Sequence, residues 1–177
     1  MSLKQKNNRG FTIIEVLIVL AIAGLILLIV FLAVPALQRS ARNTTRKNDI
    51  SSLIGGVTEF ENNNSGALPT SCSGTTTISF TGPTGSASSD SKVGYYNVNC
   101  ATNAGAKGSV YLNVSPTNPV TLPNGAGTDY AEIVLGDNCG TSGAGIPQAI
   151  AGSAESVAVL YEIETAANSY AVQCQQS

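Results

Sequence analysis

One uninterrupted apolar run near the start of the chain limits most strongly what this sequence can form. No side chain from Val16 to Val34 is polar. As an α-helix, these 19 residues would extend about 28 Å, close to the roughly 30 Å hydrocarbon core of a bilayer. We therefore expect the run to cross a membrane once and to anchor the chain there.

Charge is distributed unevenly on the two sides of this run. Residues 1–10 form a short segment that is polar and basic. A second basic cluster follows the run and contains Arg39, Arg42, Arg46 and Lys47. Nine of the eleven acidic residues lie after Asp49, and charged residues make up only 11% of the sequence. That balance is typical of neither a disordered chain nor a basic nucleic-acid-binding protein, so nucleic acid is an unsupported partner.

The four cysteines all follow the apolar run, at Cys72, Cys100, Cys139 and Cys174. None has C-x-x-C spacing and the sequence has no His, which argues against a zinc site and a thioredoxin-like site. An even number in a Ser-, Thr- and Gly-rich segment favours two disulfides formed in an oxidising compartment, with four buried free thiols as the alternative. Basic residues flank both ends of the run, so charge alone does not orient it. The leader and the disulfides place the cysteine-containing segment outside the cytoplasm.

A small residue, Gly10, stands immediately before the apolar run. An ordinary secretory signal is cut after its apolar region, which removes that region from the mature protein. A cut after Gly10 would instead remove only the basic leader and leave the anchor in place. The alternative is a signal anchor that is not cut at all.

Glu15 is the one charged residue within the start of the apolar segment. A lone carboxylate in hydrocarbon costs a few kcal/mol, so its presence indicates either a charged partner or a position near the lipid headgroups. A cut after Gly10 would create a cationic amine on Phe11, four residues before Glu15. When subunits pack side by side, the amine of one chain can then neutralise Glu15 of its neighbour.

The stretch Gly10-Phe11-Thr12-Ile13-Ile14-Glu15-Val16-Leu17 resembles the processing site of type IV prepilins and pseudopilins. The resemblance covers about residues 4–35. It implies that a prepilin peptidase cuts after Gly10 and N-methylates Phe11, and that Glu15 pairs with Phe11 of an adjacent subunit. The implied partners are the same or related pilin subunits in a filament, the pilus assembly machinery and the membrane. No cofactor and no metal are implied.

Two residues of the apolar segment, Gly24 and Pro35, disfavour a helix by about 1 and 3 kcal/mol relative to alanine. In related filaments a comparable stretch is thought to lose helicity on assembly, and the matching zone here is residues 24–35. The alternative is a simple kink at Pro35.

Beyond Pro35 the pattern changes to an amphipathic helix. An apolar stripe recurs at helical spacing and contains Ile50, Leu53, Ile54, Val57 and Phe60. Asp49, Ser52, Glu59 and Glu61 take the other side, and Gly55-Gly56 weakens the helix locally. The segment Asn62-Asn63-Asn64-Ser65-Gly66 ends it.

The remaining chain reads as short strands between polar loops. The candidate strands are residues 76–81, 93–99, 109–114, 130–135, 156–163 and 169–174. We expect an α+β, pilin-like fold in which the second half of one long N-terminal helix packs on an antiparallel sheet. Residues 1–10 form the leader, residues 11–62 the helix and residues 63–177 a disulfide-stapled head. The helix spans the membrane over about residues 11–35 and is amphipathic over about residues 36–62.

Four cysteines allow three disulfide connectivities. Cys72–Cys100 with Cys139–Cys174 is the favoured one, since late cysteine pairs in many pilins connect the loop before the final hairpin to the last strand. The other two connectivities remain open at this stage.

The sequence favours no catalytic residue. A Ser-His-Asp or Cys-His arrangement requires the missing His. Glu162 and Glu164 would share one face of a strand, where a solvated face is a better interpretation than a glycosidase-like pair. Asp137-Asn138 could contribute oxygen ligands to a loop calcium site, but the oxygen ligands are too few for a specific signal. A plain turn is the favoured interpretation of this segment. The basic cluster is expected to pair with acids of neighbouring subunits.

We therefore predict a structural subunit of a type IV pilus, which serves adhesion, twitching motility or DNA uptake. It would be a single-pass membrane protein before assembly and part of a surface filament afterwards. The alternative is a pseudopilin of a type II secretion system. A third class is a membrane-anchored binding domain that does not assemble. Glu15 argues against this class, because such a domain gains nothing from a carboxylate in its membrane segment.

Overall fold

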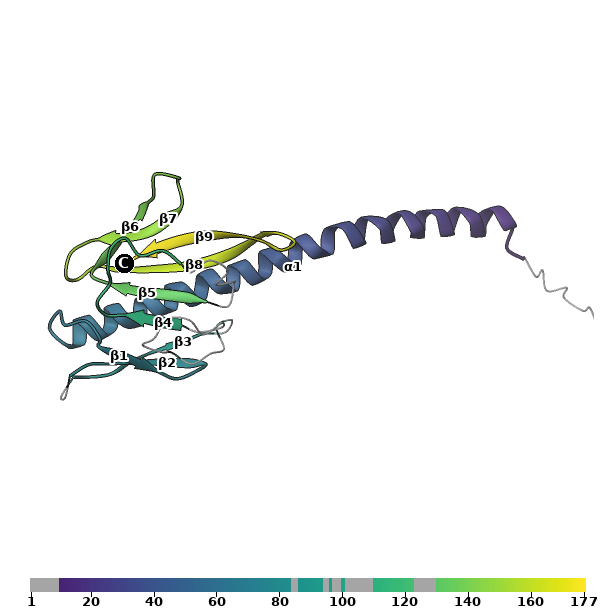
Figure 1. The fold of residues 1–177 in the computed structure, drawn as a ribbon. Coiled ribbons are helices and arrows are strands. Elements are labelled where there is room, and N and C mark those ends of the chain that lie inside the picture. The colour runs from purple at the N-terminus through teal and green to yellow at the C-terminus, as the bar shows by residue number, and fades with distance from the viewer. Residues whose placement is uncertain (1–9, 84–85, 94–95, 97–99, 101–109, 123–129) are drawn as a thin grey trace, which may run out of the picture. The chain divides into compact units, whose positions relative to one another are not determined.

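The computed structural model describes residues 10–83, 86–93, 96, 100, 110–122 and 130–177. The chain divides into two compact units, Met1–Ser40 and Ala41–Ser177. One long helix, α1 (Ile13–Asn63), contributes residues to both units (Figure 1). The long N-terminal helix of the predicted α+β fold is thereby confirmed.

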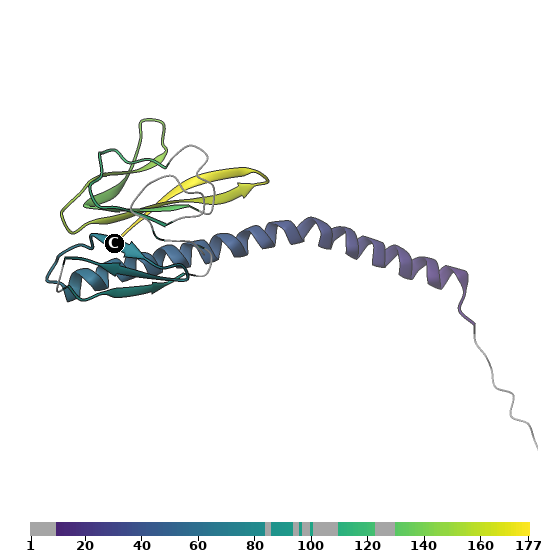
Figure 2. The same cartoon turned by 60° about the horizontal axis from the view of Figure 1, so that its bottom comes forward.

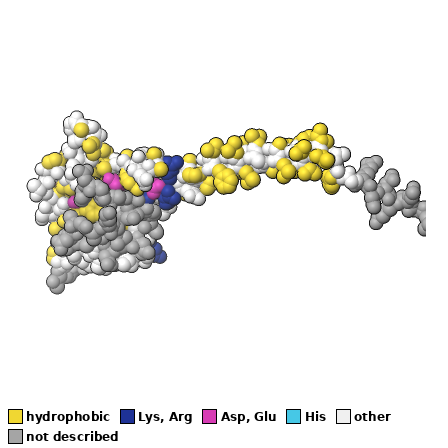
Figure 3. Space-filling model, turned by 45° about the vertical axis from the view of Figure 1, so that its right-hand side comes forward, with side chains coloured by type: hydrophobic (Ala, Val, Ile, Leu, Met, Phe, Trp, Pro, Cys, Tyr) yellow, Lys and Arg dark blue, Asp and Glu magenta, His cyan; other side chains and the backbone are white. Residues whose placement is uncertain are grey.

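In the first unit, the apolar side chains of α1 are exposed on all sides of the helix. Ile13 is 82% exposed and Leu32 is 74% exposed. The most apolar window of α1 has no buried residue and is long and apolar enough to cross a membrane. Figure 3 shows these apolar side chains along the helix surface. The helix is continuous through Gly24 and Pro35 in this single chain, so a loss of helicity on assembly stays a prediction.

In the second unit, the end of α1 buries the predicted apolar stripe. The buried set consists of Ile50, Leu53, Ile54, Val57 and Phe60. Asp49 was expected on the solvent side, and that prediction was wrong, because Asp49 is only 6% exposed. Its carboxylate accepts a hydrogen bond of 3.3 Å from the backbone N–H of Tyr96, which explains how an acid is accommodated there.

The helix ends as the Asn- and Gly-rich segment predicts. Ser65 has the left-handed φ of 56°, and the N–H of Gly66 donates to the carbonyl of Glu61 at 2.9 Å. This is the Schellman arrangement, which satisfies one of the last helical carbonyls. The side-chain amide of Asn64 satisfies another by donating to the carbonyl of Phe60.

The strands form three sheets in the described part of the chain (Figures 1 and 2). The three-stranded sheet has the order β1 (Ser71–Ser73), β2 (Thr77–Thr81) and β3 (Ser89–Lys92). The four-stranded sheet has the order β4 (Val110–Asn113), β5 (Ala131–Leu135), β8 (Val157–Ala166) and β9 (Ser169–Gln176). The two-stranded sheet pairs β6 (Asp137–Thr141) with β7 (Pro147–Ala151).

The four-stranded sheet has an apolar residue set on each face. Alternate residues of β8, including Val157 and Val159, share one core with the buried stripe of α1 and with Ile78 and Phe80 of β2. The other residues of β8, including Leu160, pack on the opposite face with Val120 and with Ala149 of β7. The two-stranded sheet therefore covers part of the face of β8 and β9 that is turned away from α1.

The sheet differs in two ways from the single antiparallel sheet that the sequence predicted. β4 and β5 are parallel, since Val110 pairs with Ala131 and Asn113 with Val134. β8 extends to Ala166, past the predicted end at residue 163, with a register shift between Glu164 and Ala166. Longer pairing with β9 accounts for the extension.

The strand predictions were correct for β2, β4, β5, β8 and β9, and missed β1, β3, β6 and β7. For the candidate over residues 93–99, Val93 and Tyr96 lie outside any strand and the remaining positions lie outside the described residues. β3 precedes it and is polar in sequence. It pairs with β2 all the same. Its buried serines are accommodated because the hydroxyls of Ser89 and Ser91 donate to the helix carbonyls of Gly56 and Ser52.

Both favoured disulfides are present, Cys72–Cys100 and Cys139–Cys174. The first closes a loop around the three-stranded sheet. The second joins β6 to β9 and so attaches the two-stranded sheet to the four-stranded one. Bridges that close loops of this size stabilise a domain by about 3–4 kcal/mol.

Two adjacent glycines of α1 give a matched test of this packing. Gly55 is exposed and a Cβ there meets nothing within 4 Å, so Gly55→Ala should raise the free energy of unfolding by about 1 kcal/mol. A Cβ at buried Gly56 would collide with Oγ of Ser91 and lie 2.9 Å from a ring atom of Phe80. Gly56→Ala should therefore lower the free energy of unfolding by about 1–3 kcal/mol. Urea unfolding of the full chain in detergent measures both, and equal stabilisation by the two variants would contradict the packing.

Candidate functional site

The start of α1 is closed by a reciprocal pair of side chains, Thr12 and Glu15. The carboxylate of Glu15 accepts hydrogen bonds of 2.8 Å from both the backbone N–H and the hydroxyl of Thr12. The backbone N–H of Glu15 donates to the hydroxyl oxygen of Thr12 at 3.4 Å. With Ile13 as the first helical residue, this is a capping box, in which the side chains three residues apart satisfy free N–H groups of the first turn.

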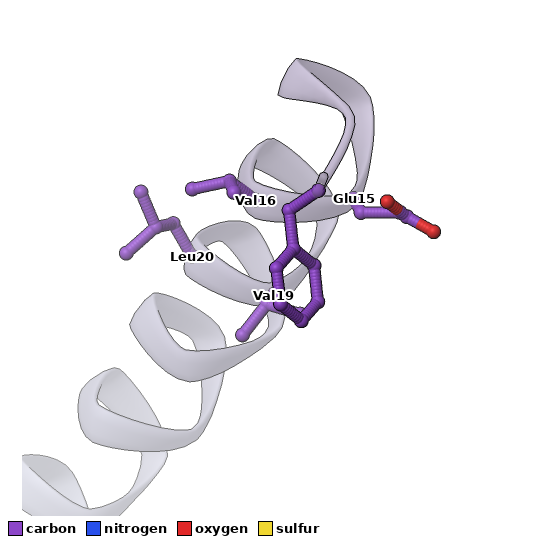
Figure 4. Close-up of a pocket in the computed structure, with 5 residues that line it drawn as sticks. Glu15, Val16, Val19 and Leu20 are labelled. Carbon is purple, nitrogen blue, oxygen red and sulfur yellow. The ribbon is translucent and has the colours of Figure 1, made fainter. Parts of the chain in front are cut away.

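Glu15 stands next to a largely apolar hollow on the helix surface. The hollow has a volume of about 300 Å³ and is lined by Phe11, Glu15, Val16, Val19 and Leu20. Figure 4 shows the carboxylate of Glu15 pointing away from Val16 and Leu20. A charged group and a wide apolar surface are thus presented side by side at the start of α1.

The peptide bond between Gly10 and Phe11 lies outside α1. Residues 10–12 have no helical backbone, and both Gly10 and Phe11 are exposed. A bond in this position lies ahead of the first helical residue, Ile13, so its cleavage requires no unwinding of the helix. The peptide bond between Gly10 and Phe11 can therefore be cut without disturbing the capping box that follows it.

Residues 5–31 match the family model of the prokaryotic N-terminal methylation motif. This motif is the hallmark of type IV pilins and pseudopilins, and it marks structural subunits rather than enzymes. No curated protein and no solved structure showed significant similarity to the chain. The chain thus carries the pilin-type processing motif at the start of α1, ahead of an α+β fold of pilin type.

A second polar cluster lies within the other unit and joins α1 to the end of β8. Arg42 forms a bidentate pair with Glu164, with Nε–Oε1 and Nη2–Oε2 distances of 3.1 and 2.6 Å. Arg46, whose side chain is 0% exposed, donates to Oε1 of Glu164 at 2.7 Å. Asn43 exchanges hydrogen bonds with the backbone N–H and C=O of Glu164. The cluster thus neutralises a buried guanidinium and fixes the hairpin against the helix.

The structure revises several of the site predictions made from the sequence. Glu162 and Glu164 do not form one carboxylate pair, because Glu164 is bound to two arginines while Glu162 lines a separate pocket with Val172. Arg42 and Arg46 pair with an acid of the same chain rather than awaiting one from a neighbour. Asp137 was predicted in a plain turn, but it lies in β6 and accepts a hydrogen bond from Asn118.

The capping box was missed by the sequence analysis, although its signal was available. Thr12-x-x-Glu15 before an apolar run is the ordinary S/T-x-x-E signature of a helix start. Glu164 had no comparable signal, because its arginine partners lie 122 and 118 residues away in the sequence.

The acid-stability of the second unit should depend on Glu164. Hydrogen bonds from Arg42, supported by those from Arg46 and by both positive charges, lower the pKa of Glu164 from 4.5 to about 2 against the opposing effect of burial. A lowered pKa in the folded state means that this stabilisation is complete above pH 4.5 and is lost as the pH falls towards about 2.

Glu164→Ala should lower the free energy of unfolding at neutral pH by about 3 kcal/mol, because it leaves Arg46 buried without its anion. Unfolding by urea at pH 7 and pH 3 measures both effects. The variant should lose less stability than the native chain over that range. Glu155→Ala, at an exposed position, is the control. Equal behaviour of the two variants would contradict the role of Glu164.

Proposed function

We propose that this chain is a structural subunit of a type IV pilus. It is inserted in the membrane as a prepilin through residues 11–35, is cut after Gly10 by a prepilin peptidase and is N-methylated on Phe11. It then polymerises with the same or related subunits into a surface filament through the pilus assembly machinery. The observation that carries the proposal is the single carboxylate of Glu15 beside the exposed apolar surface of α1, within the methylation motif.

The exposed apolar surface of α1 must be shielded from water both before and after assembly. Residues such as Phe11, Leu17 and Phe31 are all at least 60% exposed in the single chain. Burial of apolar surface contributes about 25 cal/mol per Å², so water is an unfavourable neighbour for this helix. Lipid covers the surface before assembly, and the helices of adjacent subunits cover it in the filament.

Glu15 makes packing against adjacent subunits in the filament selective for one register. In a filament core, where water is scarce, an unpaired carboxylate is penalised by several kcal/mol. Cleavage after Gly10 supplies a cationic amine on Phe11, and a subunit that docks in the correct register brings that amine to the carboxylate of its neighbour. The capping hydrogen bonds from Thr12 hold Glu15 in place until the neighbour arrives.

In this proposal the head lies outside the cytoplasm, and the two disulfides support that orientation because such bridges form in an oxidising compartment. A surface fibre that serves adhesion, twitching motility or DNA uptake is the function we favour. A pseudopilin of a type II secretion system uses the same motif and is the second candidate. The two disulfides favour the fibre, since a surface filament must persist outside the cell.

The processing step is tested on sheared surface filaments by mass spectrometry. The peptide that contains Phe11 should begin at Phe11 and carry one extra methyl group on its amine. Peptides with Lys4 or Lys6 should be absent from the filaments and present in cells without prepilin peptidase. Filaments built from the uncut chain would contradict the proposal, and a chain found only in the membrane fraction would favour the secretion pseudopilin.

Substitution of Glu15 tests the pairing. Glu15→Val should leave membrane insertion intact and reduce filament yield by about tenfold or more, since the amine of Phe11 then has no anion in the core. Glu15→Gln should be milder, because its amide oxygen still accepts a hydrogen bond. Quantitative immunoblots of sheared and membrane fractions measure both.

Thr12→Val is the matched control, because it removes the capping hydroxyl and keeps the carboxylate. It should cost the helix cap about 1 kcal/mol and leave most of the filament yield. If Thr12→Val and Glu15→Val abolished filaments equally, Glu15 would act as a helix cap rather than as a partner of Phe11.

A further inference from the structure

We propose that the face of β8 and β9 turned away from α1 carries a binding pocket for the cationic end of a lysine or arginine side chain of a protein partner, with Glu162 as its anion. The pocket has a volume of about 530 Å³. It lies wholly within the second unit, and the proposal does not rest on filament assembly.

The carboxylate of Glu162 is the feature that points to a ligand. One of its oxygens, Oε2, is buried and has no hydrogen-bond partner within the described part of the chain. Buried carboxylate oxygens are costly to leave unpaired, which is why nearly all of them bind a donor. The other carboxylates of this sheet follow that rule: Glu164 binds two arginines, and Glu132 accepts from Asn113 and Tyr130.

The wall around Glu162 has both polar and apolar parts. The hydroxyls of Thr121 and Ser142 line the pocket on the polar side. The hydroxyl oxygen of Ser142 accepts a hydrogen bond from the N–H of Ile146 at 3.1 Å, which fixes this side chain at the pocket wall. Leu122, Ile146, Pro147 and Val172 supply the hydrocarbon wall.

This combination matches an aliphatic stem that ends in a strong hydrogen-bond donor. The stem of a lysine or arginine covers apolar surface readily, while its charged head seeks an anion. The stem would lie against the apolar wall, with the ammonium or guanidinium group donating to the carboxylate of Glu162, which is partly exposed. A charge-assisted hydrogen bond of this kind is about twice as strong as a neutral one.

A bare metal ion fits the pocket less well than an organic cation. Hard cations require several oxygen ligands, and the described residues contain no group of three His, Cys, Asp or Glu side chains that could hold a metal ion. Glu162 is the single acid among the described residues that line this pocket, and the four apolar residues offer nothing to a hydrated ion.

The test is a titration of the full chain in detergent micelles, with methyl-labelled Ile, Leu and Val, followed by NMR. The probes are N-acetyl-lysine methylamide and N-acetyl-arginine methylamide, and N-acetyl-norleucine methylamide provides the same stem without charge. The methyl signals of Ile146, Leu122 and Val172 should shift and saturate with the two cationic probes and stay in place with the norleucine probe. Glu162→Gln should weaken the binding by about tenfold or more, while the exposed-site control Glu155→Gln should leave it unchanged.

Glu162→Gln should also keep the native free energy of unfolding, because the fold gives Oε2 no partner to lose. Absence of saturable shifts, equal shifts with the norleucine probe, or unchanged binding by Glu162→Gln would each overturn the proposal. A second titration, in which the concentration of the chain itself is raised without any probe, identifies the protein that supplies the cation. Shifts of the same methyl groups would show that a second copy supplies it, and their absence with probe binding intact would show that another protein does.

Discussion

A single carboxylate at the start of an apolar helix is the constraint on which this structure depends. Glu15 must be satisfied in every environment that the exposed surface of α1 enters. In the chain alone, the backbone N–H and the hydroxyl of Thr12 satisfy it. These bonds also close the first turn of the helix, so the same side chain caps α1 and remains a charged group beside the apolar hollow. The proposed pairing with the amine of Phe11 adds a partner to a group that is already in position, which lowers the cost of ordering it on assembly.

The second unit solves a related problem with a second carboxylate. Arg46 is fully buried, and a buried guanidinium without an anion would destabilise the unit by several kcal/mol. Glu164 supplies that anion from the end of β8, while the apolar stripe of α1 packs against the same strand. A helix with an apolar stripe and a neighbouring pair of arginines can therefore dock on the sheet in one register only. The opposite face of β8 is left to the two-stranded sheet and to the pocket of Glu162.

The parts of the fold that follow from local periodicity could be predicted, and the parts that follow from distant pairing could not. The stripe from Ile50 to Phe60 and the end of α1 at Ser65-Gly66 were readable, because helical spacing and turn chemistry are local. The N-terminal methylation motif was readable from the stretch Gly10 to Leu17, which lies within the residues that match the family model. The polar strand β3 could not be predicted. Burial of Ser89 and Ser91 depends on hydrogen bonds from their hydroxyls to helix carbonyls about 35 residues away in the sequence. Asp49 and Glu164 were misplaced for the same reason, because their partners are distant in sequence.

The central claim is that Glu15 exchanges an intrachain environment for a neighbour's amine when the chain assembles. The most direct test is a cryo-electron microscopy reconstruction of the purified filament at a resolution that shows side chains. The account predicts that the amine of Phe11 lies within about 4 Å of the carboxylate of Glu15 from an adjacent subunit, the range of an ion pair. A filament in which Glu15 bonds only to Thr12 of its own chain, with the amine of Phe11 elsewhere, would contradict it.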